Sequence, residues 1–228
     1  MQRLYALRIL QMVERQVAAH PGFPGSCTFK TGMITDINQL DFNQRYTYSD
    51  YLTWRFSERV ELLRGWVSRV PSPLRLHQAY SWYLSTQLMP YFQNHTSQVY
   101  TAPFDVRLPD SHKSTADKTI YTVVQPDLCV VCDKEKLDDR GCLGAPDWII
   151  EIISPGNAKK EVDTKFRLYE EAGVREYWML NMDAQNVIVC DLTPEGYDIR
   201  RIYPDDAVVP VGIFEGLKID LKAVFRED

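Results

Sequence analysis

A single acidic residue inside a buried-looking strand constrains this chain more than any other feature. Residues 147–154, with the sequence Asp-Trp-Ile-Ile-Glu-Ile-Ile-Ser, place Glu151 between two pairs of isoleucines. A short, continuous run of β-branched apolar residues is typical of a strand that is covered on both faces. An ionised carboxylate in such a strand costs several kcal/mol unless it is paired, protonated or bound to a metal ion. Glu151 is therefore the first candidate for a functional residue.

A second acidic residue precedes a similar apolar run. Residues 126–132 read Pro-Asp-Leu-Cys-Val-Val-Cys, which predicts a buried strand that begins beside Asp127. Cys129 and Cys132 have the spacing of zinc ligands, but residues three apart on a strand point to opposite faces. We interpret both cysteines as small apolar residues of a protein from a reducing cytoplasm.

The next segment predicts a helix followed by a third strand. Residues 161–172 carry apolar side chains at helical spacing, and Gly173 stands where helices commonly end. Lys165 borders the apolar face of this helix, and residues 177–180 form a third apolar run. The order strand, strand, helix, strand places Glu151 and Lys165 near the same end of a sheet.

Together these motifs resemble those of the Uma-two family, a group of bacterial proteins in the PD-(D/E)XK nuclease superfamily. The matching motifs, in chain order, are Glu61-Leu-Leu-x-Gly65, Pro71-Ser-Pro73 followed by His77, Pro126-Asp127, Glu151-Ile-Ile-Ser-Pro155, Lys165-x-x-x-Tyr169 and Ala172-Gly-Val-x-Glu-Tyr-Trp178. The resemblance covers residues 48–225. It implies an α/β, restriction endonuclease-like fold with a mixed central β-sheet flanked by helices.

The chemistry of phosphodiester hydrolysis suggests roles for the acids in these motifs. A divalent cation lowers the pKa of bound water and neutralises the charge that builds on the phosphate. Because Mg²⁺ prefers few carboxylates, we assign Asp127 and Glu151 as ligands of Mg²⁺ or Mn²⁺. The resemblance implies that the carbonyl of Ile152 also coordinates. The superfamily's usual lysine position is occupied by Ile153, and the resemblance assigns its catalytic role to Lys165 on the next helix.

Four further residues are expected beside this centre, in substrate binding or in support of the ligands: Glu61, His77, Glu161 and Tyr169. Structural alternatives stay open at this point. Glu61 suits a solvated strand end, and His77 suits an ordinary hydrogen-bonding helix position. Glu161 lies four residues before Lys165, a spacing that also forms surface salt bridges. For Glu151, the alternative is a carboxylate that completes an interior hydrogen-bond network.

The N-terminal part of the chain lies outside the resemblance. We expect residues 1–47 to form an extension, with an amphipathic helix over residues 4–20 that packs on the domain or on a partner subunit. The nuclease-like domain then spans residues 48–228, and the protein is expected to be a homodimer. Charged residues interrupt the apolar N-terminus, which argues against a signal peptide, and no apolar run approaches the length of a membrane span.

The remaining elements follow from periodicity and turn residues. The expected elements are a helix over residues 49–55 capped by Ser49, a hairpin over 60–70, a helix over 74–94, a strand over 99–108, a surface connection over 133–146, and strands over 186–192 and 197–203.

Charge limits the possible functions. The net charge is −5, so any contact with nucleic acid must come from a local basic patch. The polar loop over residues 109–118, with His112, Lys113 and Lys118, is one candidate. We expect a metal-dependent endonuclease that acts on DNA. The alternatives are a nonenzymatic nuclease-fold homodimer that binds a protein or a nucleic acid, and a hydrolase of another phosphate ester.

Overall fold

The computed structural model describes residues 33–110, 114–155 and 159–226. The helix expected over residues 4–20 lies outside these ranges, as do His112 and Lys113 of the expected basic loop. None of the described helices combines the length and the apolar character that crossing a bilayer requires.

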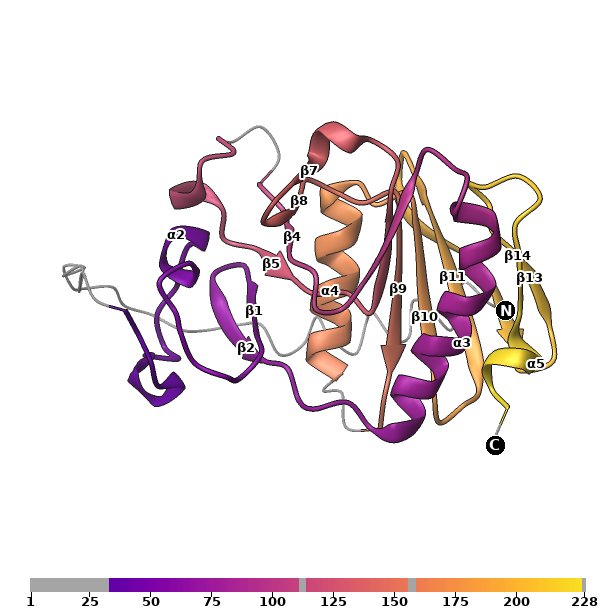
Figure 1. Ribbon diagram of the computed structural model, residues 1–228, viewed down its shortest axis with the longest axis horizontal. Helices are drawn as coiled ribbons and strands as arrows, with labels where there is room; N and C mark the ends of the chain where they lie inside the picture. The colour runs from indigo at the N-terminus through magenta and orange to yellow at the C-terminus, as the bar shows by residue number, and fades with distance from the viewer. Residues whose placement is uncertain (1–32, 111–113, 156–158, 227–228) are drawn as a thin grey trace. The chain divides into compact units, whose positions relative to one another are not determined.

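A six-stranded mixed sheet carries the central part of the chain (Figure 1). Its strands, in spatial order, are β12 (Gly196–Pro204), β11 (Asn186–Thr193), β10 (Glu176–Asn181), β9 (Trp148–Ile153), β6 (Leu128–Val131) and β3 (Gln98–Thr101). The β9–β10 pair is parallel and the other pairs are antiparallel. A parallel pair requires a crossover, and α4 (Lys159–Ala172) provides it.

The register of β6 and β9 brings the two predicted ligands to one place. Leu128 pairs with Ile150, so the residues just beyond this end of the ladder are Asp127 on one strand and Glu151 on the other. The two apolar runs therefore form neighbouring strands, as expected, and the structure shows that they are antiparallel.

Both faces of this sheet are covered, which explains why β9 is apolar on both sides. The α3 helix (Arg75–Phe92), the short α5 helix (Leu221–Val224) and the hairpin of β13 (Val208–Pro210) and β14 (Lys218–Asp220) share a core with one face. On the other face, α4 packs with β4 (Val106–Arg107), β5 (Val123–Val124) and β8 (Gly141–Leu143).

Those short strands belong to a second six-stranded sheet. Its spatial order is β2 (Trp66–Arg69), β1 (Val60–Leu63), β5, β4, β8 and β7 (Leu137–Asp138). The hairpin of β1 and β2 confirms the one predicted around Gly65. A small core that contains Ile37 and Leu40 packs against β1, so residues before position 48 contact this sheet.

Short helical turns complete the described elements. They are η2 (Ile37–Gln39), α2 (Tyr48–Tyr51), η3 (Asp117–Thr119) and η4 (Lys134–Lys136). The α2 helix begins two residues earlier than a cap at Ser49 implies. Thr47 is its cap because Thr47 and Asp50 exchange hydrogen bonds in a capping box.

Two further expectations were wrong. Residues 99–108 do not form one strand, because β3 and β4 lie in different sheets. Residues 133–146 are more than a surface connection. They contain β7 and β8, and β8 pairs in parallel with β4 through a buried Cys142.

Candidate active site

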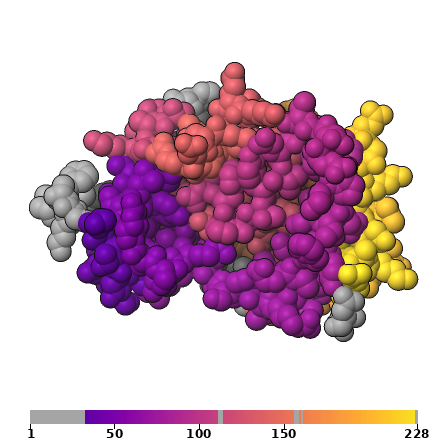
Figure 2. All heavy atoms as spheres, viewed as in Figure 1, coloured from indigo at the N-terminus to yellow at the C-terminus, as the bar shows by residue number. Residues whose placement is uncertain are grey.

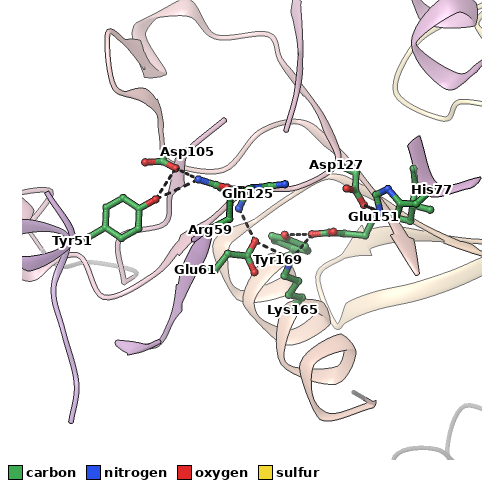
Figure 3. Close-up of polar contacts among 11 residues, drawn as sticks. Tyr51, Arg59, Glu61, His77, Asp105, Gln125, Asp127, Glu151, Lys165 and Tyr169 are labelled. Atoms are coloured by element: carbon green, nitrogen blue, oxygen red, sulfur yellow. Dashed lines mark hydrogen bonds and ion pairs between the residues drawn. The ribbon is translucent and has the colours of Figure 1, made fainter. Parts of the chain in front are cut away.

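The predicted site residues come from both six-stranded sheets and from the helices α3 and α4. Figure 3 shows Glu61 from β1, Glu151 from β9, Lys165 and Tyr169 from α4, and Asp127 beside His77. The site thus forms where the second sheet meets the end of the β6–β9 ladder.

The ammonium of Lys165 is shared between two carboxylates. Its Nζ atom is 3.0 Å from Glu61 Oε1 and 3.1 Å from Glu151 Oε1. The lysine side chain is 12% exposed. Burial lowers its pKa, but Glu151 and Glu61 raise that pKa by more, so the group remains charged. Lys165 therefore contacts acids from two strands rather than forming a surface pair with Glu161.

Glu151 is held through one of its two oxygens. Its Oε1 atom accepts hydrogen bonds from Lys165 and from the Tyr169 hydroxyl, which lies 2.6 Å away. Burial raises the pKa of Glu151 to about 7, although Lys165 acts to lower it. Its Oε2 atom makes no hydrogen bond to another described residue, which leaves that oxygen for a ligand.

Glu61 is not a solvated strand-end acid. Its side chain is 1% exposed, and its Oε1 atom accepts a hydrogen bond of 2.7 Å from the backbone N–H of Gln125 as well as the one from Lys165. The Oε2 atom is buried and has no hydrogen-bond partner. A buried carboxylate oxygen without a partner is costly, so this atom indicates a function beyond packing.

Asp127 and His77 form the other half of the site. The Asp127 Oδ2 atom accepts a hydrogen bond of 2.7 Å from the backbone N–H of Ile152 and lies 3.3 Å from His77 Nε2. Burial lowers the pKa of His77, but its hydrogen bond to Asp127 and the nearby charges raise it above its ordinary value. The backbone of Ile152, whose carbonyl the resemblance implies as a ligand, also acts to raise the His77 pKa. The Nδ1 atom of His77 is buried and has no hydrogen-bond partner among the described residues.

Seven side chains are predicted to act here, and within the described ranges Glu161 alone forms no hydrogen bond or ion pair with the other six. It is half-buried at the first turn of α4, and burial raises its pKa while Lys165 lowers it. Glu161 is therefore near the charge of Lys165 but is not its hydrogen-bond partner.

The acids fit a cation that needs few protein ligands. In the described ranges, no group of three or more His, Cys, Asp and Glu residues is arranged to hold a metal ion. Mg²⁺ commonly binds one or two carboxylates with waters and phosphate oxygens, so a larger group of protein ligands is not required for it. Asp127 and Glu151 at one end of a ladder, with the orphaned Glu61 Oε2 nearby, suit such an ion.

Sequence reasoning missed a polar network beside these acids. Gln125 joins it through three contacts: its Oε1 atom accepts from Arg59 Nε at 3.1 Å, and its Nε2 atom donates to Asp105 at 2.8 Å and to Tyr51 at 3.3 Å. Arg59 could have been found from the sequence because it lies two residues before Glu61, on the same face of the strand. The contacts of Asp105 and Tyr51 leave no pattern in the sequence.

A mixed sheet between helices, with two strand acids and a nearby lysine, defines a restriction endonuclease-like protein of the nuclease-fold class. The sequence model of the Uma2 family, described as "Putative restriction endonuclease", matches residues 48–222. The chain therefore belongs to the Uma2 family, as its motifs indicate.

A solved structure supports the fold. The chain is similar to a protein from Anabaena variabilis ATCC 29413 described as a putative nuclease belonging to DUF820, with a TM-score of 0.61 and 21% sequence identity. The similarity covers 79% of this chain and 97% of the Anabaena chain. A comparison with curated proteins found no match.

Proposed function

We propose that this protein is a metal-dependent endonuclease that hydrolyses phosphodiester bonds of DNA. The observation that carries the proposal is the buried cluster in which Lys165 bridges Glu61 and Glu151, at the ladder end that also holds Asp127. A structural salt bridge needs one acid for each base. This cluster has more carboxylate than ammonium, which favours a role for an added cation.

In this proposal, Asp127 and Glu151 hold Mg²⁺ or Mn²⁺, with the carbonyl of Ile152 as a further ligand. When bound, the cation supplies Lewis-acid stabilisation and a lower pKa for a bound water. Tyr169 fixes one oxygen of Glu151, so that the other is directed to the ligand. Lys165 offsets the negative charge that develops on the phosphate, and His77 orients Asp127 through their shared contact.

A cleavage assay tests this function. Supercoiled plasmid, linear duplex DNA, single-stranded DNA and RNA are incubated with the protein in Mg²⁺, in Mn²⁺ and in a chelator. We expect cutting of DNA in either metal and none in the chelator, and Glu151→Gln should abolish it. Cleavage that persists in the chelator or in Glu151→Gln would assign the activity to another site or a contaminant.

One observation favours a second function, that of a nonenzymatic binding module. Asp127 already contacts the imidazole of His77, and Glu151 already contacts the ammonium of Lys165, so each proposed ligand has a basic partner within the chain. Absence of cleavage on every substrate, with no stabilisation by either metal, would support this module.

We also propose a homodimer, on the basis of the amphipathic pattern in residues 4–17. Light scattering at micromolar concentration should give twice the mass of the chain. A single monomeric species under those conditions would contradict the dimer and leave the proposed chemistry unaffected.

A further inference from the structure

Positive charge in this acidic chain is concentrated in the segment that contains Glu61. Residues 45–75 contain six arginines and three acidic residues, a net charge of +3, whereas the rest of the chain carries −8. Two of those acids are engaged inside the fold, Asp50 in the capping box and Glu61 with Lys165. In Figure 2, this indigo-to-violet part of the chain occupies one continuous portion of the visible surface.

Arg59 is an arginine of this segment that contacts the polar network beside the site. It immediately precedes β1 and shares a strand face with Glu61, two residues later. Its Nε atom donates to Gln125 Oε1 at 3.1 Å. The side chain is half-buried, and across the described ranges neither of its Nη atoms has a hydrogen-bond partner and no carboxylate pairs with it. One edge of the guanidinium is thus anchored, and its remaining N–H donors are available to a ligand.

The anchor of Arg59 is itself fixed. Gln125 Nε2 donates to Asp105 Oδ1 and to the Tyr51 hydroxyl, which also donates to Asp105. Because the amide nitrogen is used on that side, the amide oxygen must face Arg59. Asp105 therefore holds Arg59 through a neutral amide and does not cancel its charge by a direct ion pair.

The same glutamine connects Arg59 to the acids. The backbone N–H of Gln125 donates to Glu61 Oε1, the atom that also accepts from Lys165. Figure 3 shows this chain of contacts from Tyr51 and Asp105 through Gln125 to Glu61, Lys165 and Glu151. Two residues, Gln125 and Glu61, thus separate the anchored guanidinium from the proposed catalytic lysine.

We infer that Arg59 is a phosphate-binding residue that holds the nucleic-acid backbone beside the cleavage site, with the surrounding arginines as its electrostatic support. The choice of nucleic acid as ligand rests on the proposed function. A guanidinium presents parallel donors that match phosphate oxygens, and an unpaired one in a basic region attracts a polyanion. An arginine with only a packing role would be expected to use more of its five donors within the protein.

Binding without cleavage tests this inference. Fluorescence anisotropy of a labelled DNA duplex is measured in a chelator over a series of salt concentrations, for the wild type, Arg59→Gln and a matched control, Arg201→Gln. Arg201 is exposed on β12 and stacks over the Tyr203 ring, so the control removes the same charge from another element. We expect Arg59→Gln to weaken binding roughly tenfold and to lower the slope of log K against log salt by about 1. Arg201→Gln should change neither quantity.

Arg59→Lys is a second variant, which distinguishes loss of the phosphate contact from an effect on folding. Lysine keeps the charge but lacks the fork, so the salt slope should return while part of the affinity remains lost. Thermal melts verify that all variants are folded. Equal effects of Arg59→Gln and Arg201→Gln, unchanged binding in folded Arg59→Gln, or no DNA binding by the wild type would each overturn the inference.

The cleavage assay separates this inference from the proposed function. A salt slope lowered by about 1 in Arg59→Gln, in a protein that cuts nothing, would uphold the phosphate contact and refute the nuclease. Cleavage by a wild type whose DNA binding is indifferent to Arg59 would refute only the phosphate contact.

Discussion

At the residue scale, the main feature of the site is an excess of carboxylates over cations. Among the described residues, Lys165 is the ammonium in contact with both Glu61 and Glu151, and each of these acids keeps an oxygen that Lys165 does not contact. A lysine between two acids cannot neutralise both. The negative charge that remains is what the proposed cation would neutralise, and Lys165 holds the two like charges together without it.

Replacing Lys165 with methionine should affect both catalysis and stability. Methionine keeps most of the apolar stem but leaves Glu61 and Glu151 facing each other without an ammonium. We expect at least a hundredfold loss of cleavage rate, the effect of removing one charge-stabilising group. Metal-free stability should fall by about 3 kcal/mol, as when a buried ion pair loses one partner. In the sequence Lys165 borders the apolar face of its helix, and its burial in the structure is the reason that its loss should also weaken the fold.

Cleavage rates and urea unfolding check the Lys165 prediction. For the unfolding measurement alone, Arg64→Gln is the control, because Arg64 pairs with Glu171 at the surface, where the side chains are 48% and 54% exposed. Loss of that pair should cost less than about 1 kcal/mol. Equal stability losses in the two variants would show that Lys165 is a surface charge in solution.

Cation affinity should depend on pH through Glu151. Its pKa is raised to about 7 by burial, against the opposing effect of Lys165. Above that pH the carboxylate is already ionised, whereas below it a proton must leave before a cation binds. The Mn²⁺ affinity measured by calorimetry should thus be nearly constant above about pH 7.5 and fall up to tenfold per unit below about pH 6.5.

Without metal, the free energy of unfolding should show the opposite dependence on pH through Glu151. Because the folded pKa of Glu151 lies above its unfolded value, protonation favours the folded state. Its contribution is complete below the unfolded pKa and is lost as pH rises through about 7. Glu151→Gln should remove this part of the pH dependence, and an unchanged pH profile in that variant would assign it to other groups.

At the element scale, the sequence predicted the long apolar strands and the helix between them, because each carries its own periodicity. β6, β9, α4 and β10 were found in this way. The two-residue strands β4 and β5 were not separated from their surroundings, since so short a segment has no period to detect. Similarly, the acids and the lysine stand in motifs, whereas Gln125 acts through a backbone N–H and an amide whose partners are distant in sequence.

The pairing of β4 with β8 holds the backbone of Asp105 in place, and a substitution of Gly141 tests this pairing. Gly141 has a φ of +115°, and a Cβ atom there would lie 2.2 Å from the backbone oxygen of Asp105. Cys142 N–H donates to that same oxygen. Gly141→Ala must therefore shift one strand from the other, and we expect a loss of about 3 kcal/mol or more, from strain together with the clash.

Gly173→Ala is the matched control for Gly141→Ala. Gly173 also has a positive φ, +90°, but a Cβ atom there would meet nothing within 4 Å. Its replacement should cost only the backbone strain, about 1 kcal/mol. Urea unfolding of both variants measures the difference, and a Gly141→Ala protein as stable as Gly173→Ala would mean that β4 and β8 are less closely joined.

At the scale of the whole molecule, the site joins two sheets that are distant in sequence. Glu61 belongs to one sheet and Glu151 to the other, and Lys165 contacts both. The proposed cation site therefore exists only when both sheets and α4 are in place. A ligand of such a site stabilises the complete fold against unfolding.

Divalent metal should accordingly raise the thermal stability of the whole chain. At a free Mn²⁺ concentration of about 100 times Kd, mass action contributes about 2.7 kcal/mol. For a chain of this size, that corresponds to a rise in Tm of roughly 5–10 °C. Glu151→Gln should lose most of this rise because it removes a ligand, while its metal-free Tm should equal or slightly exceed the wild-type value. Relief of repulsion with Asp127 and Glu61 offsets the weaker contact to Lys165.

The other interpretation of Glu151, as an acid that only completes an interior hydrogen-bond network, predicts the reverse. Tyr169 and Lys165 both donate to Glu151, so a mismatched amide would cost about 1–3 kcal/mol without metal. The wild type would then be indifferent to Mn²⁺. Melts of both proteins, with and without metal, separate the two cases. If Glu151 is a ligand, its charge stabilises the protein when a cation is bound. If Glu151 only completes a hydrogen-bond network, its charge stabilises the metal-free fold.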